Sequence, residues 1–225
     1  MQTEELLAAG LSMLCQNDSD VERLIAARSE TIISLLEQYI AEIERFNPAL
    51  SLVGSKGRQD LILRHILDSL APLGIISRYN TRHIADIGSG AGLPGIPLAI
   101  ALPDSRCTLM ERMGRRAGFL RHVQAALNLH NVTVEEAEME KVQPGRFSLV
   151  TFRAFRPLEP KMFKKLFRLC DEGGSIAAYK GRHCIATAEM TALENANPAL
   201  GSNWELFPCP VPMLDEERHL LVINK

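Results

Sequence analysis

The segment from Asp86 to Gly95 constrains the fold of this 225-residue chain more than any other part of its sequence. It reads Asp-Ile-Gly-Ser-Gly-Ala-Gly-Leu-Pro-Gly and joins a short apolar stretch at residues 83–87 to a helical stretch at 95–102. Alternating glycines let the backbone pass close to a ligand because they lack a Cβ, and the following helix offers free N–H groups. In parallel α/β sheets, ligands bind beyond the carboxyl ends of the strands. The segment therefore predicts an α/β fold with a ligand site at this turn.

The rest of the chain after residue 80 alternates between strand and helix patterns. Further strands are expected at 107–111, 132–134, 147–152, 175–179, 204–207 and 219–224, and further helices at 115–129, 160–170 and 184–194. This alternation predicts a doubly wound, mostly parallel, seven-stranded Rossmann-like sheet with helices on both faces. No helix is expected between the last two strands, so they should form an antiparallel hairpin at one edge.

Residues 1–80 predict a helical extension that packs on this domain of residues 81–225. One helix is expected at 21–45, ended by Asn47-Pro48, and another at about 59–71. Residues 1–50 hold nine acidic and three basic side chains, a net charge of −6. The whole chain carries −2, so residues 51–225 carry +4. The acidic extension should therefore pack on the sheet and not on nucleic acid.

Composition and cysteine placement exclude several classes of protein. The chain is 46% hydrophobic, the balance of a folded globular protein. Its longest apolar stretch, 93–103, contains three prolines and is too short to span a bilayer. The five cysteines are scattered without a Cys-x-x-Cys pair, which disfavours disulfides and a zinc site. We expect a cytoplasmic monomer without a bound metal, a membrane segment or a disulfide partner.

Glycine spacing alone leaves the ligand open. Gly90, Gly92 and Gly95 fit the dinucleotide fingerprint, and Glu111, 21 residues after Gly90, suits a ribose diol in either case. Asp86 favours a different ligand, because a carboxylate suits an ammonium group and repels a pyrophosphate. The pattern D-x-G-x-G-x-G is similar to the loop of class I S-adenosylmethionine-dependent methyltransferases. A nicotinamide-dependent oxidoreductase is the alternative.

The longer segment from Asp86 to Ile100 resembles the GidB/RsmG family. These bacterial enzymes methylate N7 of a guanine in small-subunit (16S) ribosomal RNA. Five further segments match the family in order: residues 63–69, 114–120, 153–154, 179–181 and 214–220. The chain departs from the family at Ser51-Leu52-Val53, at Phe152 and at Glu138. The resemblance implies S-adenosylmethionine as the methyl donor, and ribosomal RNA or an assembled small subunit as the substrate.

The resemblance, together with the fold, implies three sets of site residues. The cofactor set is Asp86, Gly88, Ser89, Gly90, Gly92, Leu93, Glu111, Arg112, Glu138, Met139 and Arg153. The catalytic set is Arg64, His65 and Asp68, which would wall the active site over the glycine loop, and Arg153 and Lys180, which would contact the RNA or the base. The RNA-binding set is Arg115, Arg116, Arg156, Lys164 and Lys165, from basic clusters at 111–122 and 153–168.

Each set has a simpler interpretation. Arg64 and Asp68 are four residues apart and could pair on a helix surface. His65 could be an ordinary buried histidine. Arg153 and Lys180 could be solvated strand ends, and the basic clusters could be solvated helix faces.

The chemistry of guanine N7 sets what a site must supply. N7 has a free lone pair and no proton at neutral pH, so its methylation needs no general base. Catalysis should come from alignment and charge stabilisation, with an Arg or Lys donor at O6 to orient the ring. Cytosine-C5 chemistry needs a cysteine nucleophile, and Pro208-Cys209 lies in the late edge region, which disfavours it. A non-catalytic S-adenosylmethionine- and RNA-binding protein and a small-molecule methyltransferase are further alternatives.

Overall fold

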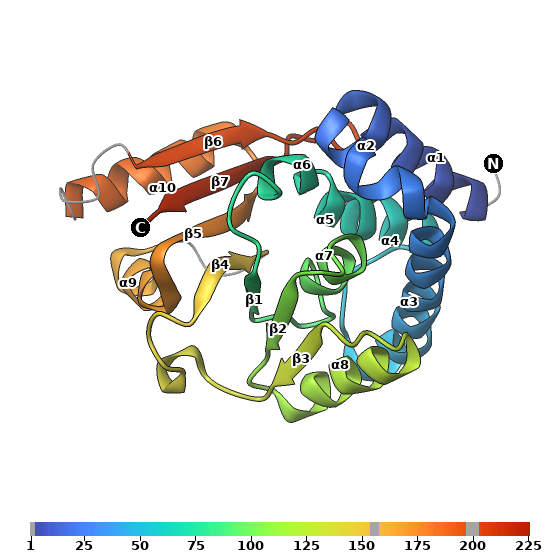
Figure 1. Ribbon diagram of the computed structural model, residues 1–225, viewed down its shortest axis with the longest axis horizontal. Coiled ribbons are helices and arrows are strands. Elements are labelled where there is room, and N and C mark those ends of the chain that lie inside the picture. The colour runs from blue at the N-terminus through green and yellow to red at the C-terminus, as the bar shows by residue number, and fades with distance from the viewer. Residues whose placement is uncertain (1–2, 154–157, 197–202) are drawn as a thin grey trace.

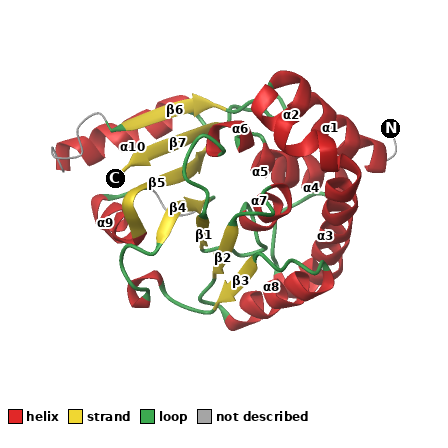
Figure 2. Ribbon diagram, in the orientation of Figure 1, coloured by secondary structure: helices red, strands yellow, loops and turns green. Residues whose placement is uncertain are grey.

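The computed structural model describes residues 3–153, 158–196 and 203–225. The strands are β1 (His83–Ile87), β2 (Arg106–Met110), β3 (Val132–Glu135), β4 (Phe147–Phe152), β5 (Cys170–Lys180), β6 (Trp204–Pro208) and β7 (His219–Asn224). They form one sheet in the order β3-β2-β1-β4-β5-β7-β6. The first five are parallel, and β7 runs antiparallel to β5 and β6. The doubly wound sheet with an antiparallel edge hairpin is therefore confirmed (Figure 2).

Helices cover both faces of this sheet. They are α1 (Thr3–Asn17), α2 (Ser19–Ile25), α3 (Ser29–Leu50), α4 (Arg58–Leu61), α5 (Asp68–Leu70), α6 (Leu73–Ile76), α7 (Gly95–Ala101), α8 (Gly114–Ala126), α9 (Pro160–Leu169) and α10 (His183–Ala196). Figure 1 shows α1, α3, α7 and α8 on one side and α9 and α10 on the other. None of the described helices is both long and apolar enough to cross a membrane.

The two faces of the sheet hold separate hydrophobic cores, because successive side chains of a strand point to opposite faces. Ile84 of β1 belongs to the core shared with α1, α3, α7 and α8, and its neighbour Ala85 belongs to the core under α9 and α10. In β7, Leu220 and Leu221 divide in the same way. The N-terminal helices thus share one core with the sheet and do not pack separately.

The N-terminal helices differ from the expected pattern. A 3₁₀ turn at Ala26–Arg28 interrupts the expected 21–45 helix, and α3 then continues past Pro48 to Leu50, so the expected stop is wrong. Proline removes only one N–H, and near a helix end few bonds depend on it. Ser51 ends α3 in a left-handed conformation and donates its N–H to Asn47 O at 2.9 Å. Helices α1 and α6 had no counterpart in the predicted pattern.

The second predicted helix is present as a continuous segment from Arg58 to Leu70. Its middle, Ile62–Leu67, is a π-helical turn, which the apolar spacing does not reveal. Such turns are rare and are frequent at functional sites. This one carries Arg64 and His65.

Candidate active site

The glycine segment lies where the two halves of the sheet diverge. The chain runs from β1 outward through β2 and β3, and β4 begins the other half on the opposite side of β1. Ligands of open α/β sheets bind at this switch point. Gly88, Gly90 and Gly92 have φ angles of +70°, +59° and +96°, which explains the choice of glycine. A Cβ on Gly92 would lie 2.6 Å from Ile96 Cγ1.

Asp86 lies beneath this loop and holds it in place. Its Oδ2 accepts hydrogen bonds from Ser89 Oγ at 2.5 Å and from the Gly95 N–H at 3.0 Å. Its Oδ1 is buried without a partner in the described structure. Burial raises the pKa of Asp86 to about 6, although both hydrogen bonds lower it. The carboxylate is thus placed by the loop and keeps one unsatisfied oxygen.

The N-terminus of α7 offers no free N–H to a ligand, so that expectation is wrong. The Gly95 N–H is taken by Asp86, the Ile96 N–H by Gly92 O at 2.7 Å, and Pro97 has none. All residues of α7 are buried. A pyrophosphate needs free N–H groups at this position. The closed terminus therefore argues against a dinucleotide.

A cleft of about 560 Å³ opens beside the loop, over the carboxyl ends of β1 and β2. Glu111 follows β2 and is buried, with Oε2 accepting from the Gly90 N–H at 3.0 Å and Oε1 from the Met113 N–H at 2.9 Å. Each oxygen keeps a lone pair for a hydroxyl donor. Apolar groups of Ala137, Met139 and Met162 line the cleft as well. Its volume is that of an ordinary small-molecule site.

The expected cofactor residues fall into two groups. Those that line the cleft are Gly88, Glu111, Arg112, Glu138, Met139 and Arg153. The others lie in or beneath the loop, outside the lining: Asp86, Ser89, Gly90, Gly92 and Leu93. In the second group, Asp86, Ser89, Gly92 and Leu93 form hydrogen bonds within the segment 86–95, whereas Gly90 donates its N–H to Glu111.

Tyr39 of α3 contributes to the loop and was not predicted as a site residue. It is fully buried, and its Oη donates to Ala91 O at 2.7 Å. A helix of the extension therefore holds the ligand loop directly. The only signal in the sequence is a tyrosine on an otherwise aliphatic helix face, since a buried tyrosine usually needs a partner for its hydroxyl.

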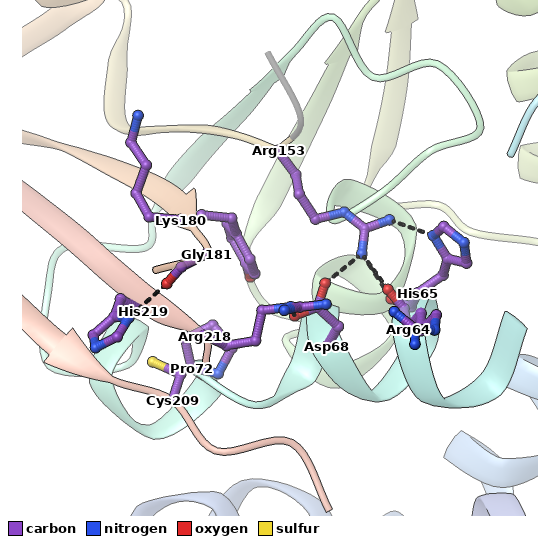
Figure 3. Close-up of a pocket in the computed structure, with 11 residues that line it drawn as sticks. Arg64, His65, Asp68, Pro72, Arg153, Lys180, Gly181, Cys209, Arg218 and His219 are labelled. Carbon is purple, nitrogen blue, oxygen red and sulfur yellow. Dashed lines mark hydrogen bonds and ion pairs between the residues drawn. The ribbon is translucent and has the colours of Figure 1, made fainter. Parts of the chain in front are cut away.

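A second pocket, of about 300 Å³, lies on the other side of Arg153. It is lined by Arg64, His65, Asp68, Pro72, Arg153, Tyr179, Lys180, Gly181, Cys209, Arg218 and His219 (Figure 3). The structure thus brings together all five expected catalytic residues. Arg153 lines both this pocket and the cleft. Arg218 belongs to a segment that resembles the family, but it was not expected to be a site residue.

Asp68 is the centre of this second pocket, which we call the Asp68 pocket. Its side chain is 9% exposed, and it accepts from Arg153 Nη1 at 2.8 Å and from Arg218 Nε at 3.1 Å. Arg153 Nη1 also reaches the carbonyls of Arg64 at 3.1 Å and His65 at 3.3 Å. The surface pair of Arg64 with Asp68 is therefore wrong: Arg64 pairs with Asp60 and with Glu216.

His65 and Lys180 have different surroundings within this pocket. Burial, and then the charge of Arg153, lower the pKa of His65 to about 4. His65 is therefore neutral at pH 7, and its Nδ1 accepts from Arg153 Nη2 at 3.1 Å. The Lys180 ammonium pairs with Glu189 and points away from Asp68 (Figure 3).

Cys209 lines the Asp68 pocket but is unsuited to nucleophilic chemistry. Burial raises the pKa of its thiol to about 12. The thiolate is the nucleophilic form, so at neutral pH this sulfur is inert. Across the described ranges, no three His, Cys, Asp or Glu side chains are placed to hold a metal ion.

Four of the five expected RNA-binding residues are among those that the structure describes. Arg115 and Lys164 are exposed. Arg116 and Lys165 line the cleft itself; Arg116 donates to Ser51 O at 3.3 Å and Lys165 pairs with Glu140 at 2.5 Å. Arg156 lies outside the described residues.

Known proteins similar to this chain agree in their names. Residues 32–218 match the GidB family model, described as rRNA small subunit methyltransferase G. Ribosomal RNA small subunit methyltransferase G of Treponema pallidum (strain Nichols) is 37% identical over 88% of each chain. Its namesake from Nitrosomonas eutropha is 34% identical over 100% of this chain and 98% of its own.

Solved structures show the same fold at low sequence identity. The O-methyltransferase from Bacillus cereus, in complex with SAH, matches with a TM-score of 0.58 and 16% identity. The match covers 84% of this chain and 91% of that one. The likeness shows a Rossmann-like fold.

Proposed function

This chain belongs to the rRNA small subunit methyltransferase G family, and from that premise we propose that it transfers a methyl group from S-adenosylmethionine to N7 of a guanine in small-subunit ribosomal RNA. The observation that carries the proposal is the meeting of two cavities at Arg153. One cavity has the groups that a nucleoside ligand needs, and the other has charged groups that suit a polar base.

The cleft fits S-adenosylmethionine on the chemistry of its groups. The Glu111 carboxylate would accept from the ribose hydroxyls, and the apolar wall of Ala137, Met139 and Met162 would pack against the adenine. The amino-acid part would lie near Gly88, where the unsatisfied Asp86 Oδ1 beneath the loop favours an ammonium group. S-adenosylmethionine supplies the methyl group in electrophilic form when bound.

The Asp68 pocket would hold the guanine. Arg153 and Arg218 are cationic donors that suit the guanine O6, and Asp68 fixes both of them. Alkylation at N7 leaves positive charge on the base, and the Asp68 carboxylate would offset part of the charge of the two arginines beside it. His65 is neutral and already accepts a hydrogen bond, so it serves to hold Arg153 and not to move a proton. N7 needs no proton removed, so this arrangement is sufficient.

The cations around the cleft would bind RNA phosphates. Arg115 and Lys164 are exposed, and Arg112, Arg116 and Lys165 lie at the cleft. Phosphate contacts release counterions, so RNA affinity should fall as salt rises. We place the protein in the cytoplasm, acting as a monomer on ribosomal RNA or on an assembled small subunit.

Labelled-methyl transfer tests this function. Small subunits from cells that lack the gene, wild-type subunits and naked small-subunit RNA are each incubated with the protein and labelled S-adenosylmethionine. The proposal predicts label only in RNA from the deletion strain, released by hydrolysis as 7-methylguanine. No label in any RNA, with S-adenosylmethionine binding confirmed, would leave the non-catalytic or small-molecule alternative.

A further inference from the structure

One carboxylate joins two arginines at the outer side of the Asp68 pocket. Glu216 Oε1 lies 2.5 Å from Arg64 Nη1, and Glu216 Oε2 lies 2.8 Å from Arg218 Nη2. Arg64 comes from the π-helical turn, and Arg218 directly precedes β7. Both arginines line the pocket, whereas Glu216 is outside its lining.

Each guanidinium is anchored independently of Glu216. Arg64 Nε lies 2.6 Å from Asp60 Oδ1. Arg218 Nε donates to Asp68 Oδ1 at 3.1 Å, and its Nη1 donates to Glu217 O at 2.9 Å. Glu216 contacts only one terminal nitrogen of each arginine. Both guanidinium groups therefore keep an anchor when Glu216 leaves.

Glu216 is also the partner that can leave most easily. Its side chain is 36% exposed, and residues 215–217 are exposed as a segment. Exposed ion pairs contribute little to stability, and both members of the Glu216–Arg64 pair are exposed. A phosphodiester carries one negative charge and two free oxygens, as a carboxylate does, and arginine binds both in the same paired geometry.

We propose that Arg64 and Arg218 form a phosphate subsite for RNA, and that Glu216 occupies this subsite until an RNA phosphate displaces it. The inference rests on the proposed function, because the phosphate belongs to the backbone of the RNA that this function would methylate. Asp68 anchors both Arg218 and Arg153, so the subsite is one carboxylate away from the residue that lines the cofactor cleft. The phosphate is therefore that of the target nucleotide or of its neighbour.

Binding of a labelled single-stranded oligoribonucleotide, measured by fluorescence anisotropy across a salt series, tests the subsite. Glu216→Gln should lower the Kd about two- to fivefold, because the phosphate no longer competes with a carboxylate. The salt dependence should steepen, by a slope of about 0.7 for one more net contact. Asp215→Asn is the matched control, because Asp215 is an exposed acid in the same segment and makes no contact with either arginine in the described structure. It should change the Kd by less than about half of that effect.

A double-mutant cycle with Arg64→Gln makes the test specific. Arg64→Gln should weaken RNA binding, and Glu216→Gln should then tighten it less than in the wild-type protein. The subsite would be overturned if Glu216→Gln tightened RNA binding equally in the wild-type and Arg64→Gln proteins. It would also be overturned if Asp215→Asn tightened RNA binding as much as Glu216→Gln does. RNA binding by Glu216→Gln that is no tighter than that of the wild type would overturn it too.

Two further measurements separate failure of the subsite from a loss of folding and from failure of the proposed function. If Glu216→Gln lowers the unfolding midpoint, Glu216→Asp decides, because its shorter carboxylate cannot bridge both arginines and should tighten binding to a smaller extent. Methyl transfer by the wild-type protein is measured in parallel. If the wild-type protein transfers methyl groups but the Glu216 variants bind RNA no more tightly than it does, only the subsite is overturned. If the wild-type protein neither binds RNA nor transfers methyl groups, the proposed function is overturned as well.

Discussion

The cofactor cleft and the Asp68 pocket share Arg153, but they are built in different ways. The cleft depends on one loop, residues 86–95, whose backbone N–H groups bond to the buried carboxylates of Asp86 and Glu111. The Asp68 pocket depends on charged side chains from segments far apart in the chain; Asp68 and Arg218 are separated by 150 residues. The cleft should therefore be sensitive to added bulk, and the pocket to lost charge.

Gly92→Ala should have the largest effect, and it acts on the cleft. The new Cβ would lie 2.6 Å from Ile96 Cγ1 and 3.1 Å from Tyr39 Oη, at a φ of +96°. We expect a loss of about 3 kcal/mol in the free energy of unfolding and at least about a hundredfold weaker S-adenosylmethionine binding. Denaturant titration and calorimetric titration measure the two. The control is Gly118→Ala in α8, where a Cβ meets nothing within 4 Å; it should be neutral or stabilising.

Asp68→Asn should have the next largest effect, through charge. It removes the carboxylate between Arg153 and Arg218, whose side chains are 12% and 21% exposed. We expect a loss of about 2 kcal/mol in unfolding free energy and a fall in methyl transfer, with S-adenosylmethionine affinity changed less than about twofold. Asp104→Asn, at an exposed acid outside the lining of both cavities, is the control for a general loss of charge. Equal effects of both substitutions on transfer would contradict the central role of Asp68.

The two regions should respond to pH in opposite directions. The pKa of Asp86 is raised to about 6 by burial, so its stabilising contribution is complete below its unfolded pKa and is lost as pH rises through 6. The pKa of His65 is lowered to about 4, so its contribution is present above 6.5 and is lost as pH falls toward 4. Between pH 7 and 5 each contributes a change of about 1–2 kcal/mol, with opposite sign.

Two variants separate these opposite contributions in denaturant titrations at pH 5, 6 and 7. Relative to the wild type, Asp86→Asn should lose the gain in stability on acidification, and His65→Gln should lose the decline. Equal pH dependence in both variants would contradict the assignment.

The smallest expected difference between the cleft and the Asp68 pocket comes from two tyrosines. Tyr39 Oη donates to Ala91 O at 2.7 Å in the cleft loop, and Tyr179, in the lining of the Asp68 pocket, donates its Oη to Ser69 O at 2.7 Å. Each Phe variant should lose about 1 kcal/mol of stability, since one hydrogen bond is removed. Only Tyr39→Phe should weaken S-adenosylmethionine binding, by about two- to fivefold. Weakening by both variants alike would show that the regions are not separate.

The same contrast explains what the sequence could predict. The cleft comes from a local pattern, because glycine spacing, the preceding Asp86 and the distance to Glu111 all lie within 26 residues. Residue type did not reveal that the Asp86 side chain lies buried beneath the glycines and bonds to Ser89 and Gly95. Its burial depends on the helices that pack over the loop. Tyr39 was missed for the same reason.

The Asp68 pocket could be found only through resemblance to a family. No spacing rule joins Asp68 to Arg218, and the local rule for residues four apart gave the wrong partner for Arg64. Arg64 does pair with a residue four positions away, but that residue is Asp60, and its second partner, Glu216, comes from the far end of the chain. The resemblance grouped five residues that line this pocket, but it assigned no role to Arg218.

Arg153→Lys tests most directly whether the two regions meet at this residue. Lysine keeps the charge but cannot bond at once to Asp68, the two backbone carbonyls and His65. We predict about a hundredfold slower single-turnover methyl transfer to deletion-strain small subunits, with S-adenosylmethionine Kd changed less than about threefold. Transfer at the wild-type rate, or a Kd that rises in proportion to the loss of transfer, would contradict the account.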